Sequence, residues 1–299
     1  MKALIIGFGS IGKKHFLALK NLGFDISLLS FSACKKDVKE TKLYNSWDEL
    51  SLMEFDLFII ANITTLHLET LKKIDTFVKD KIILVEKPLF EKFIPFQSNK
   101  NKIFIAYLLR FNPLIKALKE ILQVEKPYFV ELSCHSYLPN WRDIDYRENY
   151  SAKKELGGGV LLDLSHEIDL AFFLFGKLKL LYSENLKLSE LEIDSDDFAF
   201  LSLKNSKDLK IHIKLDYFSK LTQRKIIIHT PKKSYEADLI QGILKIYNED
   251  KSIKTQIYKS DTILTLESMH KAILNNDKNL CSLDEALDVL KICDEVKNG

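Results

Sequence analysis

Short apolar runs alternate with helix-like segments over roughly the first third of the chain. The runs have strand length and cover residues 3–6, 26–29, 55–61, 81–85 and 102–107. Between them, residues 11–22 and 65–77 carry apolar side chains at helical spacing, and Gly23 stands where the first of these helices should stop. Strands that alternate with helices are typical of βαβ units, so this part predicts a parallel sheet.

The pattern changes after about residue 110. A helix is expected over 114–122, a strand over 128–136 and an apolar helix over 160–175. From 177 to about 258 the apolar residues alternate with period two, as in a mostly antiparallel sheet with one buried face. Two helices close the chain, and Ser282 with Glu285 forms a capping box at the start of the second.

Composition and charge exclude several classes of protein. The 299 residues are 46% hydrophobic and 29% charged, as in a globular chain, and about 150 residues per domain gives two domains. The net charge of +2, from 44 basic and 42 acidic residues, is too balanced for a nucleic-acid footprint. No apolar run approaches the length of a membrane span, and the first residues do not resemble a signal peptide. The four cysteines lack paired spacing and the histidines lack a ligand-like cluster, so we expect a cytoplasmic protein without a metal.

A glycine loop joins the first strand to the first helix. It reads Gly7-Phe8-Gly9-Ser10-Ile11-Gly12, and this strand–loop–helix context is the one in which G-x-G-x-x-G holds a dinucleotide pyrophosphate. No acid follows the second strand. Ser30, Ser32 and Lys35 stand there instead, which favours NADP(H) over NAD(H). The alternative is that the lysines of this segment only begin a solvated charged loop.

Three motifs in this order resemble the glucose-fructose oxidoreductase / inositol dehydrogenase (Gfo/Idh/MocA) family. They are the glycine loop, Glu86-Lys87-Pro88, and the segment 157–170 with its glycine triplet, Asp163 and His166. The resemblance covers essentially the whole chain. It implies an α/β fold: a Rossmann dinucleotide-binding domain over 1–109 and a substrate-binding and oligomerisation domain over 110–299, with a large, open, mostly antiparallel sheet.

The resemblance also implies roles for individual residues. Lys87 would lie beside the nicotinamide and the substrate hydroxyl, His166 would transfer the proton, and Asp163 would be its companion. Glu86 and Pro88 would fix the turn that presents Lys87, often with a cis peptide bond before the proline. The loop at 62–67 would line the nicotinamide side through the residues Asn62, Thr64 and His67.

The residues themselves support the same site. Eleven of the sixteen residues in 160–175 are apolar, so this helix should be buried, and the polar groups that interrupt it are expensive to bury unless they are paired or line a cleft. Lys87 follows an apolar strand at the carboxyl end of the parallel sheet, where ligands bind in such folds. A hydrogen-bonded core histidine and a surface lysine are the plainer alternatives.

Substrate recognition is expected within 107–150. The chain has 40 lysines and four arginines, and three of the arginines fall in one stretch of 38 residues. Arginine is favoured where a planar fork must bind a carboxylate or phosphate, and aromatic rings among amides and charges suit sugars. The candidates are Arg110, Trp141, Arg142, Tyr146 and Arg147. The alternative is a surface loop with internal salt bridges.

Together these features predict an NAD(P)-dependent oxidoreductase. It would transfer a hydride between nicotinamide C4 and a secondary alcohol or ketone of a sugar, sugar acid or nucleotide-linked sugar. A homodimer or homotetramer is expected, because an open sheet leaves one face to be covered. The second interpretation is a non-catalytic NADP(H)-binding regulator of the same fold; the presence of both Lys87 and His166 argues against it.

Overall fold

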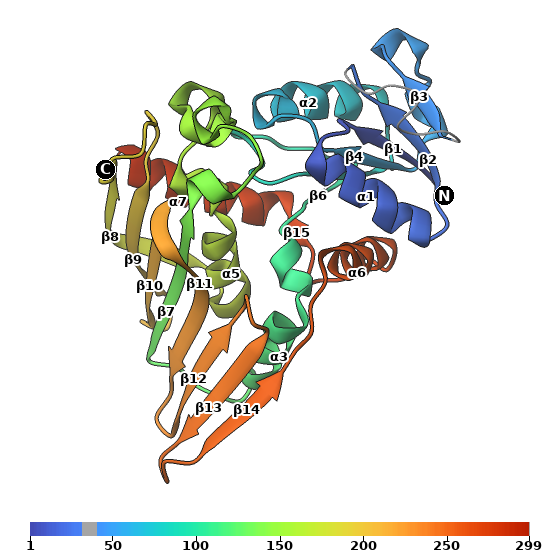
Figure 1. Ribbon diagram of the computed structural model, residues 1–299. Coiled ribbons are helices and arrows are strands. Elements are labelled where there is room, and N and C mark those ends of the chain that lie inside the picture. The colour runs from blue at the N-terminus through green and yellow to red at the C-terminus, as the bar shows by residue number, and fades with distance from the viewer. Residues whose placement is uncertain (32–40, 299) are drawn as a thin grey trace. The chain divides into compact units, whose positions relative to one another are not determined.

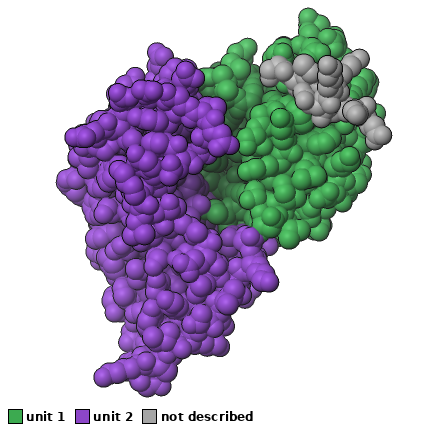
Figure 2. All heavy atoms as spheres, in the orientation of Figure 1, with its two compact units in different colours: residues 1–90, 94–111, 261–287 green, residues 91–93, 112–260, 288–299 purple. Residues whose placement is uncertain are grey.

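The computed structural model describes residues 1–31 and 41–298 and shows two compact units. Unit 1 comprises residues 1–90, 94–111 and 261–287, and unit 2 comprises residues 91–93, 112–260 and 288–299 (Figure 2). The first unit thus ends close to the expected boundary at 109, but it also includes 261–287, which the sequence pattern had assigned to the second domain. Residues 261–287 belong to unit 1 because they add a strand and a helix to it.

Unit 1 is built around a seven-stranded sheet (Figure 1). Its strands, in the order in which they pair, are β15 (Cys281–Ser282), β6 (Lys102–Ile105), β5 (Ile82–Val85), β4 (Leu57–Ile60), β1 (Lys2–Ile6), β2 (Asp25–Leu29) and β3 (Lys42–Tyr44). All neighbours are parallel except β15 and β6. The parallel sheet is therefore confirmed. The strands β3 and β15 are too short to be predicted from an apolar pattern.

Apolar burial holds the helices of unit 1 in place. They are α1 (Ser10–Asn21), α2 (His67–Phe77) and α6 (Thr262–Leu274), with short 3₁₀ helices at Trp47–Glu49, Leu52–Glu54, Thr64–Leu66 and Leu108–Phe111. Leu19 of α1 and Met269 of α6 belong to one core with Ile59 of β4. A fully buried side chain of this size contributes about 1.5–3 kcal/mol, which explains why α6 docks on the first unit despite its distance in sequence.

Unit 2 is built around an eight-stranded sheet with one parallel pair, β10 and β7. Its strands, in the order in which they pair, are β14 (Ile253–Ile257), β13 (Ile243–Asn248), β12 (Lys233–Asp238), β11 (Phe218–His229), β7 (Phe129–Tyr137), β10 (Lys210–Asp216), β9 (Phe198–Asn205) and β8 (Leu178–Leu186). The other neighbours are antiparallel, as the period-two pattern predicted.

Helices cover one face of this sheet. Val130 and Leu132 of β7 and Ile211 and Ile213 of β10 are fully buried, and the residues between them point to the other face. The helices of unit 2 are α3 (Pro113–Ile121), α4 (Val160–Asp163) and α5 (His166–Phe175), with 3₁₀ helices at Leu138–Asn140, Tyr146–Glu148, Tyr150–Ala152 and Lys154–Leu156.

Helix α7 (Leu283–Asn298) starts in unit 1 and ends in unit 2. The capping box at its start is confirmed: the Ser282 N–H donates to Glu285 Oε2 at 2.9 Å, and the Glu285 N–H donates to Ser282 Oγ at 3.3 Å. Within residues 1–31 and 41–298, no helix combines the length and the apolar character that crossing a membrane requires.

Candidate functional site

The glycine loop of unit 1 leaves room for a ligand at the start of α1. Gly7 has φ +96°, and a Cβ there would stand 2.5 Å from the Ala61 carbonyl oxygen, so only glycine fits. A Cβ on Gly12 would also strike the Gly7 carbonyl, whereas one on Gly9 would meet nothing within 4 Å. The first backbone hydrogen bond of α1 runs from the Lys13 N–H to the Gly9 carbonyl oxygen. The N–H groups before Lys13 have no acceptor within the helix and are therefore available to a ligand at this open position. These residues therefore fit the pyrophosphate of a dinucleotide.

The segment after β2 is described only in part. Ser30 is buried, its N–H donates to the Tyr44 carbonyl, and its own carbonyl accepts a hydrogen bond from the Asn45 amide. Phe31 is exposed. Ser32 and Lys35, which the sequence analysis places at the cofactor ribose, lie outside the described residues.

The turn after β5 presents Lys87 at the carboxyl end of the parallel sheet. The peptide bond between Lys87 and Pro88 is cis, as the family resemblance implied. The Lys87 N–H donates to Glu86 Oε2 at 3.1 Å, so the carboxylate beside Lys87 also holds its main chain.

His67, expected at the cofactor, is buried under this turn. Its Nδ1 lies 3.0 Å from the Pro88 carbonyl oxygen and its Nε2 lies 3.1 Å from that of Asn62. The ring therefore joins the loop after β4 to the turn after β5. The Asn62 amide donates to Thr70 at 2.9 Å, and Thr64 lies half-buried in the 3₁₀ helix that follows.

In unit 2 the glycine triplet leads into a broken helix. Gly159 has φ +120°, and a Cβ there would collide with the Asp196 carboxylate, which accepts the Leu161 N–H at 3.0 Å. The expectation of one helix over 160–175 is wrong, because α4 ends at Asp163 and α5 begins at His166. In an unbroken helix Asp163 and Glu167 would lie on one face as like charges. The break lets each carboxylate reach a different partner.

Tyrosine hydroxyls hold Asp163. The Tyr217 hydroxyl donates to Asp163 Oδ2 at 2.6 Å, and both side chains are buried. Burial, together with the Asp163 charge, raises the pKa of Tyr217 well above its usual value and also raises the pKa of Tyr150. Both phenols therefore stay protonated and can donate to Asp163. Its expected role as the companion of His166 stays a prediction.

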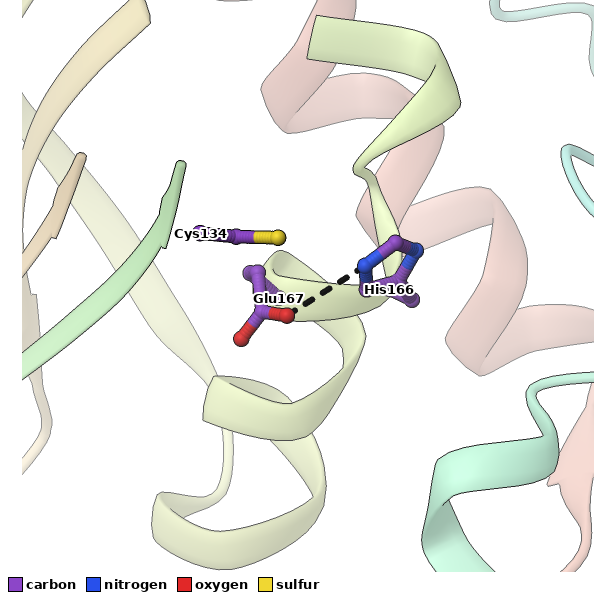
Figure 3. Close-up of side chains that lie close together, drawn as sticks. All are labelled: Cys134, His166 and Glu167. Atoms are coloured by element: carbon purple, nitrogen blue, oxygen red, sulfur yellow. Dashed lines mark ion pairs between the residues drawn. The ribbon is translucent and has the colours of Figure 1, made fainter. Parts of the chain in front are cut away.

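His166, by contrast, lies against Glu167 (Figure 3). Its Nε2 is 3.3 Å from Glu167 Oε1, and the same oxygen lies 2.6 Å from both Nε and Nη2 of Arg224, which projects from β11. Burial raises the pKa of the Glu167 carboxyl, but the charges of Arg224 and His166 outweigh it and the pKa stays below the usual value. Glu167 is therefore a buried anion that Arg224 and His166 share. The sequence analysis did not single out either Glu167 or Arg224.

Cys134 completes a cluster that the sequence spacing did not predict. Its sulfur, a nitrogen of His166 and an oxygen of Glu167 all lie within 4.8 Å of one another (Figure 3). Arg224 is the cross-strand neighbour of Cys134, so a guanidinium already neutralises the carboxylate. A cation added here would meet that positive charge at close range, and the arrangement favours proton handling by His166 over metal binding.

Comparison with known proteins places this architecture. Residues 117–236 match the family model of the GFO/IDH/MocA C-terminal domain. The chain carries a GFO/IDH/MocA C-terminal domain. This confirms the resemblance that the three motifs indicated, while a search of curated protein sequences finds no match.

Solved structures share the fold over the whole chain. Levoglucosan dehydrogenase, in complex with NADH and levoglucosan, has a TM-score of 0.83 at 15% identity and covers 100% of this chain and 96% of its own. The WlbA dehydrogenase from Bordetella pertussis, in complex with NADH and UDP-GlcNAcA, has a TM-score of 0.78 at 16% identity and covers 99% and 95%. UDP-N-acetylglucosamine 3-dehydrogenase GnnA from Acidithiobacillus ferrooxidans has a TM-score of 0.78 at 16% identity and covers 100% and 97%. At these identities the likeness shows the fold.

The expected substrate residues differ in how the structure uses them. Arg110, in unit 1, is fully buried, and its Nη1 lies 3.2 Å from Oε2 of the partly exposed Glu285 and 3.3 Å from the Leu280 carbonyl oxygen. Its expected contact with the substrate stays a prediction. In the C-terminal domain, Arg147 is exposed but bound to Asp145 at 2.6 Å and to Glu192 at 2.7 Å.

Trp141 and Arg142 each contact one of the two tyrosines that lie beside Asp163. Trp141 packs edge-on against Tyr217 at 5.1 Å between ring centres, and the exposed Arg142 guanidinium stands 5.1 Å from the Tyr150 ring centre. Among the described residues Arg142 has no carboxylate within 4 Å. The half-buried Tyr146 accepts the Glu192 N–H with its hydroxyl, which fixes the loop.

Proposed function

We propose that this protein is an NAD(P)-dependent oxidoreductase that transfers a hydride between nicotinamide C4 and a secondary alcohol or ketone carbon of a carbohydrate. The observation that carries the proposal is the open Gly9 position at the start of α1, in the same unit as the turn that presents Lys87. The solved structures named above, dehydrogenases of sugars and nucleotide-linked sugars, support the same class of reaction.

The bound cofactor would supply the hydride donor or acceptor. The residues proposed to hold it are those of the glycine loop, Gly7, Phe8, Gly9, Ser10, Ile11 and Gly12, with Asn62, Thr64 and Glu86 nearby. We propose NADP(H) over NAD(H) because no carboxylate follows β2 where NAD-binding chains carry one, and Ser30, Ser32 and Lys35 stand there instead. Two of the fold relatives were solved with NADH, so the preference rests on residue types alone.

Lys87 and His166 share the work at the reacting oxygen in this proposal. The Lys87 ammonium donates a hydrogen bond to the substrate oxygen and stabilises its developing charge. The His166 imidazole accepts the hydroxyl proton in oxidation and returns it in reduction. Glu167, held by Arg224, stabilises the imidazolium that forms. Asp163, held by its tyrosines, remains the proposed companion on the other side of the helix break.

The proposed substrate is an anionic or nucleotide-linked sugar. Arg142 is exposed and not engaged by a carboxylate among the described residues, and Trp141 is a half-buried aromatic ring beside it. Arg147 is already paired with Asp145 and Glu192, so its proposed contribution is to hold the loop. Arg142→Ala should therefore raise KM for an anionic substrate more than Arg147→Ala does; equal effects of both, or none, would reject an anion site at Arg142.

The open face of the eight-stranded sheet supports homo-oligomerisation; the cytoplasmic location that we propose rests only on the unpaired spacing of the cysteines. Tyr128, His229, Phe129, His212, Phe200 and Tyr182 form a row of ring contacts across β11, β7, β10, β9 and β8, and Tyr128 and Tyr182 are more than half exposed. Such a patch is suited to a second copy of the chain. Sedimentation of the purified protein tests this proposal, and a monomer at micromolar concentration would reject it.

A titration with NADPH and, separately, NADH tests the cofactor proposal. Gly9→Ala is the sharpest variant, because its φ of −72° suits alanine and the methyl group meets no protein atom, yet it would stand where the pyrophosphate approaches. We expect unchanged thermal stability and a dinucleotide Kd raised by at least about tenfold, or about 1.4 kcal/mol.

Gly7→Ala is the matched control. It should instead destabilise unit 1 by about 1–3 kcal/mol, because its φ is positive and the Ala61 carbonyl is in the way. Unchanged binding by Gly9→Ala, or no binding of either nucleotide to the native protein, would reject the proposed cofactor site. Tight binding without turnover of any free, acidic or nucleotide-linked sugar would favour a regulator over an enzyme.

A further inference from the structure

Three buried histidines surround the turn that carries Lys87. His15 of α1, His67 of α2 and His270 of α6 are each at most 1% exposed. His67 contacts the Pro88 carbonyl, as described above, whereas His15 contacts Glu86 and His270 contacts His15. Burial of three imidazoles is costly unless they are hydrogen-bonded, so their arrangement calls for an explanation.

His15 and His270 form a chain that ends at the main chain of Lys87. His270 Nε2 lies 2.9 Å from His15 Nδ1, and His15 Nε2 lies 2.7 Å from Glu86 Oε1. The other Glu86 oxygen accepts the Lys87 N–H. Three elements far apart in sequence are thus joined in one chain of hydrogen bonds, and α1 and α6 run side by side in unit 1 (Figure 1).

The direction of the hydrogen bonds follows from the groups at the two ends. A carboxylate can only accept, so His15 Nε2 carries the hydrogen and its Nδ1 is free to accept one. Burial, and then the neighbouring His15, lower the pKa of His270 well below its usual value, so His270 is neutral with a single N–H. His270 Nδ1 has no partner among the described residues, and a buried lone pair is tolerated better than a buried N–H. His270 Nε2–H therefore donates to His15.

We infer that His15, with His270 behind it, is a positioning residue that fixes Glu86 and through it the main chain of Lys87. This inference rests on the proposed function for the role of Lys87, and on the buried chain alone for the geometry. Because His15 lies three residues after Gly12 on α1, the helix that starts at the dinucleotide position also orients the turn with the proposed reactive lysine.

Two amide substitutions separate the two ends of the His15 ring. The amide nitrogen of glutamine lies as many bonds from Cβ as His15 Nε2 does, so His15→Gln keeps a donor to Glu86. The amide of asparagine matches Nδ1, so His15→Asn faces His270 and leaves Glu86 without its donor. A role in core packing alone would make the two variants alike, and a positioning role predicts that glutamine rescues.

Hydrogen exchange at the Lys87 amide tests the geometry without any reaction. We expect His15→Asn to speed exchange there on the order of tenfold or more, since its acceptor is no longer fixed, and His15→Gln to stay within about threefold of the native protein. His135→Asn is the matched control: its ring lies 2.5 Å from Asp216 in unit 2, and its loss should leave Lys87 unchanged. Equal exchange at Lys87 in both His15 variants would overturn the inference.

Nitrogen NMR of the imidazoles provides a second test. His15 should carry its hydrogen on Nε2 in the native protein and in His270→Gln, which keeps the donor to Nδ1. His270→Phe removes that donor but not the acceptor Glu86, so His15 should keep its hydrogen on Nε2 there too, and only its Nδ1 resonance should move. An Nδ1–H tautomer already dominant in the native protein would overturn the chain as drawn.

Kinetics connect the geometry to the reaction. We expect kcat of His15→Asn to fall about 10–100-fold, with KM and dinucleotide Kd within about threefold, and His15→Gln to recover most of kcat. Losses that are equal in both variants and track their melting temperatures would overturn the inference. If the native protein turns over no carbohydrate, the proposed function fails, and the exchange and tautomer results still decide whether the chain positions Lys87.

Discussion

The Lys87 turn in unit 1 and the His166 segment in unit 2 use the same residue types in opposite ways. Around Lys87, buried histidines hold the turn, and the lysine is the proposed reactive group. Around His166, the histidine is the proposed reactive group, and a carboxylate with an arginine does the holding. A histidine in this fold can therefore either hold a segment in place or be the proposed reactive group, depending on the residues that it contacts.

The two ways of holding a segment also respond differently to their surroundings. A histidine that is neutral in a protein core stops stabilising the fold in acid, because the unfolded chain, in which this histidine can bind a proton, is then favoured. A buried ion pair withstands mild acid but depends completely on both partners being present. Each difference can be measured.

Removal of Arg224 should have the largest effect. Arg224→Gln leaves the fully buried Glu167 with only His166 to balance its charge, and breaking a buried pair in this way costs about 3–5 kcal/mol. Denaturant unfolding should show this loss, and hydrogen exchange should place it in α5 and β11.

The control for that loss is the exposed arginine Arg147. Its pairs with Asp145 and Glu192 lie in solvent, so Arg147→Gln should hardly change the unfolding curve. The double variant E167Q/R224Q, which removes both charges of this pair, should be more stable than R224Q alone. An R224Q curve that overlays the R147Q curve would contradict a buried ion pair as the support of His166.

The sequence predicts the scaffold of both regions better than their side-chain partners. Periodicity gives the parallel and antiparallel sheets, and a local signal, Ser282 with Glu285, gives the start of α7. His15, Glu167 and Arg224 were not singled out because their partners come from other elements, and no spacing along the chain records a contact across 57 or 71 residues. The return of 261–287 to unit 1 is hidden for the same reason.

Arg110 and the helix break show a second limit. An arginine among lysines suggests a ligand contact, whereas in the structure the buried Arg110 pairs with the partly exposed Glu285. The run 160–175 is apolar enough for one helix, yet Asp163 and Glu167 must reach Tyr217 and Arg224, and tertiary hydrogen bonds outweigh local propensity. The role of such a residue can be predicted only when the residue that it contacts in the fold is known.

Mild acid should weaken unit 1 before the His166 segment. Burial lowers the pKa of His67 and of His270, so the unfolded chain binds protons that the folded chain does not. Stability is therefore full above the unfolded pKa of about 6.5 and falls below it. Between pH 7.5 and 5.5 each such histidine costs at most about 1.4 kcal/mol, the value reached when its folded pKa lies far below this range. The Glu167 carboxyl has a lowered pKa, so its contribution is lost only below its usual value of 4.5.

Hydrogen exchange at the two pH values, corrected for intrinsic rates, measures this difference. Peptides from α2 and α6 should lose protection at pH 5.5, while those from α5 should keep it. His270→Gln removes one of the two titrating groups and should reduce the loss in α6. Equal loss in both regions, or none in either, would refute the assignment of neutral histidines to the Lys87 turn.

The smallest effect is expected at the cap of α7, and it serves as a pH-independent reference for the stability of unit 1. Ser282→Ala removes the hydroxyl that accepts the Glu285 N–H at 3.3 Å, so unit 1 should lose about 1 kcal/mol, the usual worth of a helix N-cap. The capping hydroxyl does not titrate in this range. The loss should therefore be the same at pH 7.5 and pH 5.5, unlike the loss that the buried histidines cause. A capping loss that grew at the lower pH would mean that acid loosens unit 1 as a whole, and the histidines would then no longer explain the difference between the two regions.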